Sequence, residues 1–285
     1  MVFITTATGQ IGAVAARALA ARGVAVRGGS RDPKRVAIDG VQGVRFDFAD
    51  PSTFGPALDG VSSVFIVAPP GFADVFSLVG PFMRAAVERN LRIVTMTASG
   101  VEYVAEAPMR QLELLAERTT GGWVHIRPTW FSQNFQTFWL PGILAAGVIA
   151  VPAADARTAF IDTRDIGEVA AAVLANTSLA GQALTLTGPE ALTYTEAADV
   201  LTKVSGRAVT YNAIDDASFE QGLVSFGVPA DYAQLMVMLF QAVRAGGAAT
   251  VTQTVEQLLG RAPRSLQQYA TEYASIWAEA TAAAK

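Results

Sequence analysis

The first residues that could do chemistry are Thr6, Gly9 and Gly12, which lie between an apolar run and an Ala-rich segment. In a strand–loop–helix unit, Gly9 would let the backbone approach a pyrophosphate, and Gly12 would let helix and strand pack closely. Thr6 stands where the first glycine of such a loop is usual, and its β-branched side chain restricts the backbone. The spacing predicts dinucleotide binding; a purely structural glycine-rich turn is the alternative. The expected cofactor contacts in this loop are Thr6, Thr8, Gly9, Gln10, Ile11 and Gly12.

Charged residues follow the second apolar run, where the adenosine ribose of a dinucleotide would lie. Arg31 stands where a 2′-phosphate would sit, and Lys34 and Arg35 add positive charge. A guanidinium can bind a phosphate through two parallel hydrogen bonds, so NADP(H) is favoured, with NAD(H) as the alternative. Asp32 could cap the next helix or hold a free ribose. Asp47 is either an acceptor for the adenine amino group or a turn residue. The further expected cofactor contacts are Ser30, Arg31, Asp47, Phe48, Ala68, Pro69, Pro70 and Thr97.

Hydroxyl groups and aromatic rings follow the later apolar runs. Thr97 and Ser99 come after the fifth run, and Tyr103 follows them. Ligands of open parallel sheets bind beyond the carboxyl ends of the strands, so a hydroxyl there could orient a carbonyl, or it could belong to a structural turn. Aromatic and methionine side chains suit a bulky planar ligand, and ordinary core packing is their alternative role. The candidate substrate contacts are Phe72, Trp130, Phe131, Asn134, Phe138, Tyr232 and Met236.

The elements that would position these residues alternate along the first half of the chain. Strand-length apolar runs are followed by segments of helical period, which is typical of βαβ units. Runs such as Val64–Val67 and Ile93–Met96 are apolar throughout, as expected of parallel strands buried on both faces. We therefore predict an α/β fold with a Rossmann-type doubly wound parallel sheet and a smaller α/β C-terminal substrate region. The six expected strands are Val2–Thr5, Val24–Arg27, Val44–Phe46, Ser63–Val67, Arg92–Thr97 and Trp123–Ile126.

The alternation becomes less regular after Pro128. We therefore expect a dinucleotide-binding domain over residues 1–155 and a smaller substrate-binding region over residues 156–285, sharing one body. The elements expected in the second region are a strand at Leu184–Leu186, a helix opened by the capping box of Thr193 and Glu196, and helical residues from Pro263 to Trp277 packed on the body.

Composition excludes several classes of protein. The 285 residues include no cysteine and one histidine, His125, so disulfide scaffolds and cysteine nucleophiles are excluded and no metal site is expected. His125 lies inside an apolar run and reads better as a buried structural residue than as an acid–base group. A formal charge of −4 argues against nucleic-acid binding. Because prolines interrupt the uncharged stretch Pro128–Ala154 and no secretory leader is recognisable, we expect a soluble cytoplasmic monomer or homodimer with no membrane span.

Seven motifs follow one another along the chain: Thr6–Gly12, Ser30–Pro33, Phe46–Pro51, Phe65–Pro70, Ile126–Phe135, Phe160–Ile166 and Leu186–Thr193. Together they resemble the NmrA-like group of atypical short-chain dehydrogenases/reductases. The resemblance extends in register over residues 1 to 225, and its specificity comes from the set of motifs rather than from any one of them. It implies a Rossmann-type domain with NADP(H), a small α/β substrate region, and membership among quinone, dye or flavonoid-type reductases, aromatic polyketide tailoring enzymes or regulators that only sense the cofactor.

The chain departs from usual reductase chemistry at the proton donor. A short-chain reductase usually pairs a tyrosine with a lysine four residues on, but Tyr103 is followed there by Ala107, and no lysine lies between Lys34 and Lys203. Reduction of an isolated ketone makes a strongly basic alkoxide, whereas a quinone yields a phenolate whose conjugate acid has a pKa of about 10. We therefore expect an NADPH-dependent reductase of a quinone-like or polycyclic aromatic substrate, for example in polyketide tailoring. Ser99 or Thr97 would hold an oxygen of a small aromatic substrate, and solvent or the substrate's phenols would supply the proton.

Two other functions stay open. A non-catalytic NADP(H)-sensing regulator would bind the cofactor without turnover, and a cofactor-dependent isomerase or dehydratase would show no net oxidation of nicotinamide. Tyr103 could also donate a proton unaided. If the side chain of Thr6 crowds the phosphates, Thr6→Gly should strengthen cofactor binding.

Overall fold

The computed structural model describes residues 1–278, which divide into two compact units. We expected one boundary after residue 155, but the chain passes between the two units several times, because a later helix and strand return to complete the first unit. Unit 1 consists of residues 1–128, 163–186 and 257–260, and unit 2 consists of residues 129–162, 187–256 and the described chain from 261 onward.

Unit 1 contains a parallel sheet that, within residues 1–278, has seven strands in the order β3-β2-β1-β4-β5-β6-β8. This order confirms the predicted doubly wound α/β fold. The seventh strand, β8, was expected in the C-terminal region but pairs in parallel with β6, because its apolar residues are buried at that edge. The strands are β1 (Val2–Ile4), β2 (Val26–Ser30), β3 (Val41–Arg45), β4 (Ser63–Val67), β5 (Arg92–Met96), β6 (Trp123–Pro128) and β8 (Gln182–Leu186).

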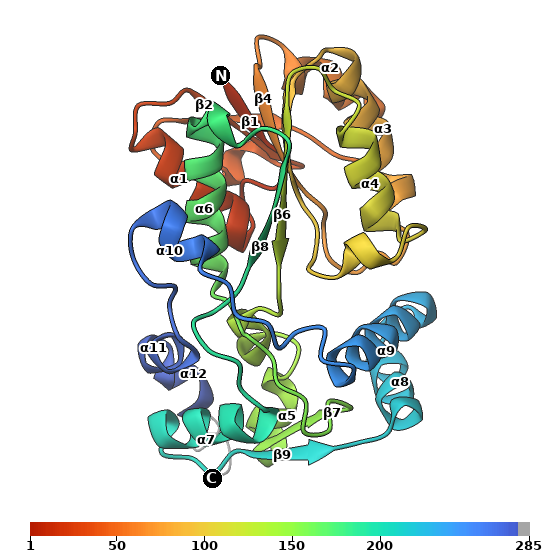
Figure 1. The fold of residues 1–285 in the computed structure, drawn as a ribbon, viewed down its shortest axis with the longest axis vertical. Helices are drawn as coiled ribbons and strands as arrows, with labels where there is room; N and C mark the ends of the chain where they lie inside the picture. Colours follow the sequence, from red (N-terminus) through yellow and green to blue (C-terminus); the bar gives the residue numbers. More distant parts are fainter. Residues whose placement is uncertain (279–285) are drawn as a thin grey trace. The chain divides into compact units, whose positions relative to one another are not determined.

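Helices cover both faces of this sheet. Figure 1 shows α1 and α6 together on one side and α2, α3 and α4 on the other. A Cβ on Gly167 of α6 would lie 2.7 Å from the Cβ of Val14 in α1, so this glycine allows the two helices to approach closely. On the opposite face Phe3, Phe46 and Phe82 pack edge to face. The helices are α1 (Gln10–Ala20), α2 (Phe54–Leu58), α3 (Val75–Glu88), α4 (Pro108–Ala116) and α6 (Thr163–Ala175).

The connections of unit 1 include four short 3-10 segments, η1 (Pro33–Arg35), η2 (Pro51–Thr53), η3 (Val101–Tyr103) and η5 (Thr177–Leu179), among the described residues. Asp32 and Asp50 cap η1 and η2 by accepting bonds from the amides of Lys34 and Ser52. The α6 helix ends against Arg92, whose guanidinium donates to the carbonyls of Val173 and Leu174.

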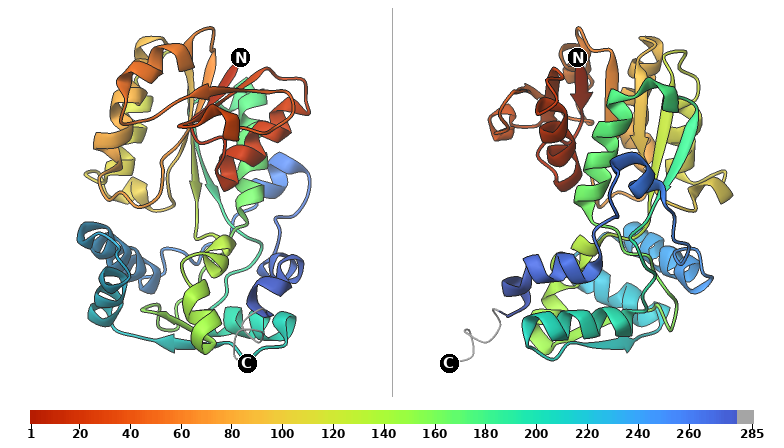
Figure 2. Two further views of the ribbon diagram at one scale, coloured as in Figure 1. Left: turned by 180° about the vertical axis from the view of Figure 1, so that it is seen from behind. Right: turned by 60° about the vertical axis from the view of Figure 1, so that its left-hand side comes forward.

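Unit 2 is built around a cluster of aromatic side chains that includes Phe135, Trp139 and Tyr194. The expected capping box of Thr193 and Glu196 is present at the start of α7. Helices α11 and α12 pack along α7 (Figure 2), and the indole of Trp277 donates to the carbonyl of Phe135, so the C-terminal helical residues pack on the unit as predicted. The elements are η4 (Ser132–Gln136), α5 (Leu140–Ala146), β7 (Val148–Val151), α7 (Tyr194–Ser205), β9 (Thr210–Ala213), α8 (Asp216–Ser225), α9 (Ala230–Arg244), α11 (Leu266–Glu272) and α12 (Ala274–Ala278); α10 (Thr254–Leu259) belongs partly to each unit.

None of the helices in residues 1–278 combines the length and the apolar character needed to span a membrane. The same residues contain no group of three His, Asp or Glu side chains that could hold a metal ion.

Candidate cofactor and active site

The loop after β1 is shaped to receive an anion. Gly9 is the N-cap of α1 with an extended backbone (φ −85°, ψ 167°), and no side chain caps this helix. The amide of Gly9 donates to the carbonyl of Thr6 at 2.9 Å. The amides of the first turn of α1 therefore have no partner within the helix and, together with the helix dipole, favour a phosphate group.

The glycine at position 12 is required by sterics. A Cβ there would lie 2.1 Å from the carbonyl oxygen of Thr6, whereas a Cβ at Gly9 would lie 3.3 Å from the same atom. In the described chain, Asn90 and Ala154 are the non-glycine residues with positive φ, so Thr6 needs no left-handed backbone and its turn needs no glycine. The missing first glycine therefore does not distort the loop.

The loop is anchored to the neighbouring strands at the point where the strand order reverses. The hydroxyl of Thr5 donates to the carbonyl of Val67 at 3.2 Å and accepts from the amide of Val67 at 3.0 Å. The amide of Ala7 donates to the carbonyl of Gly29. The carboxyl ends of β1 and β4 thus meet here, with Ala68 and Pro69 half-buried beside them and Pro70 exposed, as in the crevice where open α/β sheets bind ligands.

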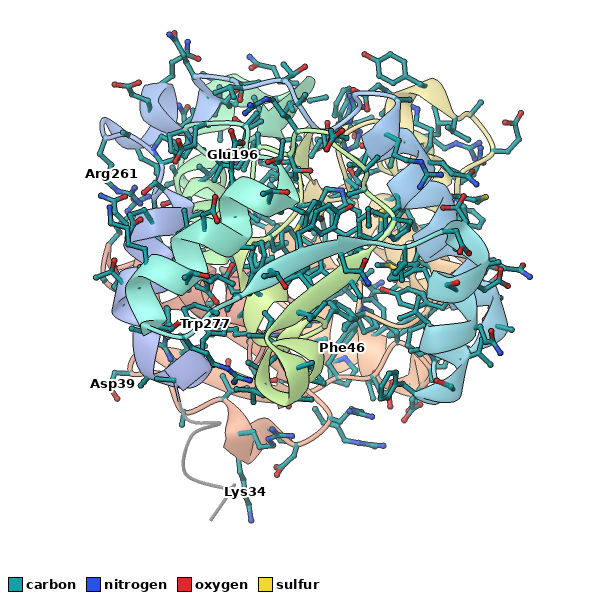
Figure 3. The ribbon with its side chains drawn as sticks, turned by 90° about the horizontal axis from the view of Figure 1, so that it is seen from below. Lys34, Asp39, Phe46, Glu196, Arg261 and Trp277 are labelled. Carbon is teal, nitrogen blue, oxygen red and sulfur yellow. The ribbon has the colours of Figure 1, made fainter. Side chains whose placement is uncertain are left out.

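The residues expected at the adenosine end lie at the carboxyl ends of β2 and β3. Arg31 is exposed, and Lys34 projects away from the ribbon (Figure 3). Asp32 caps η1. The carboxylate of Asp47 accepts a hydrogen bond from the amide of Ala49 at 3.0 Å. Asp47 thus has the turn role that was one of its two alternatives in the sequence. Phe48 is 9% exposed and packs on the ring of Phe46 rather than being available as a free surface.

A second arginine at this end was missed. Arg45 pairs in register with Ser30, and its side chain is 66% exposed, with one ion pair to Asp50 at 3.2 Å. A Cβ on Gly43 would lie 2.4 Å from the carbonyl oxygen of Pro33, so η1 covers the face of β3 that carries Gly43 and, two residues on, Arg45. The face of a strand and its register are tertiary properties, so the sequence could only have shown a basic residue near a strand end.

The two hydroxyls after β5 differ in what they contact. Thr97 is 3% exposed and donates to Oε1 of Glu113 at 2.7 Å. Ser99 is half-buried, its amide donates to the carbonyl of Pro128 at 3.0 Å, and its hydroxyl bonds to no other group in residues 1–278. The proton of Thr97 is therefore already used, whereas that of Ser99 is available to a ligand. Tyr103 is 86% exposed and lies on η3.

His125 has the structural environment expected of it. It is fully buried, its ring stacks on Trp123 with centroids 4.5 Å apart, and its Nε2 lies 3.4 Å from Oε1 of Glu117. Burial lowers the pKa of His125, although the carboxylates of Glu113 and Glu117 oppose this effect. The imidazole is therefore neutral near pH 7.

The substrate candidates are distributed over both units. Phe72 belongs to unit 1 and is 48% exposed, whereas the others belong to unit 2. Trp130 and Tyr232 are half-buried beside the aromatic cluster. Met236 is 7% exposed within the cluster, so it has the core-packing role that the sequence left as the alternative to substrate contact. The remaining three are half-buried Phe131, Asn134 at 9% exposure and Phe138 at 49% exposure.

Comparison with known proteins places this geometry in a family. A model of the NmrA-like family matches residues 116–275, and a model of NAD(P)H-binding proteins matches residues 6–177. An uncharacterized oxidoreductase, YesF, from Bacillus subtilis (strain 168) is 34% identical over 278 residues, covering 97% of this chain and 96% of the relative. The (4-alkanoyl-5-oxo-2,5-dihydrofuran-3-yl)methyl phosphate reductase of Streptomyces griseus is 31% identical over 283 residues, covering 98% and 99%.

A solved structure shows the same fold. The NADPH-dependent quinone oxidoreductase of Escherichia coli, complexed with NADPH, superposes with a TM-score of 0.83 at 24% identity, covering 96% of this chain and 99% of that one. The two family matches, the dinucleotide loop and the strand order agree with one another. This chain belongs to the NmrA-like family of NAD(P)H-binding proteins.

Proposed function

We propose that this protein is an NADPH-dependent reductase of quinone-like or polycyclic aromatic compounds, including aromatic polyketide intermediates. Its membership of the family and its oxidoreductase relatives make it an oxidoreductase that uses NADP(H). When bound, the reduced nicotinamide supplies the hydride; the residues of this chain bind, orient and hold oxygen. The substrate class is the part that is proposed.

The available groups suit the cofactor. The uncapped first turn of α1, which begins after Gly9, would hold the pyrophosphate, and the close approach of Gly12 to Thr6 packs the helix against the loop. Arg31 and Arg45, one after β2 and the other at the end of β3, would hold a 2′-phosphate, because both are exposed at the same sheet end. A surface ion pair such as Arg45 with Asp50 contributes less than about 1 kcal/mol, so its cation can turn to a phosphate at little cost.

The observation that supports the substrate class is the state of the hydroxyls after β5. The free hydroxyl of Ser99 can donate to a carbonyl oxygen, but no lysine lies near it in sequence to acidify a tyrosine, and Thr97 donates to Glu113. Ser99 can therefore stabilise a developing oxyanion without protonating a strong base. This favours acceptors that leave a phenolate, whose proton comes from solvent or from the substrate itself.

The experiment is a comparison of acceptors with NADPH as the donor. We expect oxidation of NADPH by 1,4-naphthoquinone and none by cyclohexanone, and a loss of kcat of about 10²-fold in Ser99→Ala. Thr97→Val serves as the comparison, with a smaller loss. Equal turnover of the isolated ketone would contradict the proposal, and tight NADPH binding with no turnover of any quinone would favour the cofactor-sensing regulator.

A further inference from the structure

The loop that carries Ser99 is held by a fully buried carboxylate. Glu113, in α4, is 0% exposed and accepts hydrogen bonds from three side chains. Thr97 donates at 2.7 Å, Arg110 at 2.8 Å, and Arg127 through both Nε at 2.9 Å and Nη2 at 2.8 Å. Burial acts to raise the pKa of Glu113, but the hydrogen bonds from Arg127, Thr97 and Arg110 outweigh it and hold the pKa below its usual value. The carboxylate is therefore ionised at neutral pH.

Arg127 connects this carboxylate to the loop. It lies in β6, and while one side of its guanidinium binds Glu113, Nη1 lies 3.5 Å from Oε1 of Glu102. The other oxygen of Glu102 accepts from the amide of Gly100 at 3.0 Å. Gly100 has φ of +93°, so the chain turns sharply next to Ser99.

The segment from Thr97 to Glu102 is thus held at three points. The side chain of Thr97 binds α4, the amide of Ser99 binds the carbonyl of Pro128 at the end of β6, and Glu102 faces Arg127. The hydroxyl of Ser99, within this segment, bonds to no other group in residues 1–278. A three-point attachment fixes the position of this hydroxyl relative to the ends of β5 and β6.

A buried ion pair is a poor way to gain stability, because desolvation offsets the attraction between the charges, and an apolar pair of similar size often stabilises a protein as well or better. What the pair adds is geometry, because a bidentate arginine–carboxylate contact has one preferred orientation. At a strand end that carries a free hydroxyl, fixed geometry is what an oxyanion donor requires.

We infer that Glu113 and Arg127 are positioning residues that hold the Thr97–Glu102 loop so that the hydroxyl of Ser99 meets the substrate oxygen. The inference rests on the proposed function only for the role of Ser99. The restraint of the loop is a property of the protein without ligand and can be measured separately.

Hydrogen exchange of the ligand-free protein is the first measurement. In Glu113→Gln and Arg127→Lys, we expect the amides of Ser99 and Gly100 to exchange at least about 10-fold faster, because an opening equilibrium shifted tenfold gives that change. Arg92→Met is the matched control: Arg92 is also a buried arginine, but it starts β5 at the opposite end and donates to carbonyls at the end of α6. Its loop exchange should stay within twofold of the wild type. We call Glu113→Gln and Arg127→Lys the clamp variants. Unchanged exchange of the Ser99 and Gly100 amides in both clamp variants would overturn the inference.

Turnover and cofactor affinity are the second measurement. We expect both clamp variants to lower kcat with 1,4-naphthoquinone by about 10-fold while the Kd for NADPH changes less than twofold, since the phosphate loop lies on other strands. An equal loss of NADPH affinity would show a general structural defect and contradict the inference. If Glu113→Gln does not fold, Glu102→Gln, which removes one charge at a half-buried site and leaves Glu113 intact, gives the same readouts.

The two failures are distinguishable. If Ser99→Ala keeps full turnover while the clamp variants loosen the loop, the proposed role of Ser99 fails and the restraint stands. If Ser99→Ala loses turnover while the clamp variants leave both loop exchange and kcat unchanged, the proposed function stands and the inference about Glu113 and Arg127 fails.

Discussion

The two glycines of the phosphate loop should respond differently to the same added methyl group: Gly12 through stability and Gly9 through cofactor binding. In Gly12→Ala the Cβ would lie 2.1 Å from the carbonyl oxygen of Thr6 and 2.7 Å from its carbonyl carbon, whereas real Cβ atoms essentially never come within 3.0 Å of another heavy atom. The carbonyl must therefore retreat by about 0.9 Å, and it belongs to backbone that accepts the amide of Gly9. In Gly9→Ala the closest contact is 3.3 Å, which a shift of a few tenths of an ångström relieves.

The sizes of three opposing contributions decide whether each variant is more or less stable than the wild type. Overpacking costs about 1–3 kcal/mol, and weakening the bond from Gly9 adds about 1 kcal/mol. Alanine in a helix recovers about 1 kcal/mol relative to glycine. For Gly12→Ala we expect a net loss of about 1–3 kcal/mol, or a fall in Tm of about 2–12 °C, together with weaker NADPH binding. For Gly9→Ala we expect a change in stability below about 1 kcal/mol, because its extended backbone suits any residue, but a rise of about 10-fold in the Kd for NADPH.

The assay combines thermal unfolding without ligand and calorimetric titration with NADPH. Gly55→Ala is the control, because nothing lies within 4 Å of the added Cβ and the residue is in a helix. An unchanged Tm in Gly12→Ala would refute the steric argument. Equal destabilisation by Gly9→Ala would refute the assignment of separate packing and ligand roles to the two glycines.

Three further predictions follow from the same structure. Arg31→Ala and Arg45→Ala should each weaken binding of NADPH by about 10-fold and of NADH by less than twofold in calorimetric titrations, because a phosphate hydrogen bond to a charged group contributes about 1.5–3 kcal/mol; equal losses for both cofactors would contradict a 2′-phosphate site. Arg92→Met should lower the free energy of unfolding in urea by about 2 kcal/mol, since buried carbonyls at the end of α6 lose their donor; an unchanged urea midpoint would contradict this. Burial lowers the pKa of His125, so the unfolded chain binds this proton first; its contribution to stability should be full above the usual histidine pKa of about 6.5 and be lost as the pH falls towards 5. The pKa of Glu113 is also lowered, because hydrogen bonds outweigh burial, and its contribution is lost only below its usual value of 4.5. His125→Phe should flatten the fall between pH 7.5 and pH 5 in urea titrations, and a wild type equally stable at those two pH values would argue against the shift of His125.

Much of unit 1 was predictable because its information is local. Apolar runs of strand length separated by helical segments predict parallel strands, and a glycine pattern between the first strand and helix predicts a phosphate loop. The strand β8 was expected outside this sheet because the segment before it, from Thr129 to Asp162, reads as the start of a second region. Local patterns do not show that β8 will pair with β6, a strand more than 50 residues earlier in the chain.

The candidate site likewise has features that the sequence predicts and features that only tertiary contacts decide. The positions of the lysines in the sequence, with none between Lys34 and Lys203, determined that the usual tyrosine–lysine acid is absent. Which of two hydroxyls is free was decided by α4, which places Glu113 against Thr97 and leaves Ser99 unbonded. Which hydroxyl is bonded depends on the packing of α4 against the end of β5, which brings together Thr97 and Glu113, 16 residues apart. The spacing of these residues in the sequence does not predict this contact.

The sequence by itself determined the class of this protein: a doubly wound α/β fold, the family, and a dinucleotide loop between the first strand and helix. Only the tertiary structure decided that Arg45 lies beside Ser30, that Met236 is core, and that a buried carboxylate restrains the loop of Ser99. The reason is physical. Hydrophobic period and backbone preferences act between neighbours in the chain, whereas register, burial and hydrogen-bond partners are set by contacts between residues far apart in sequence.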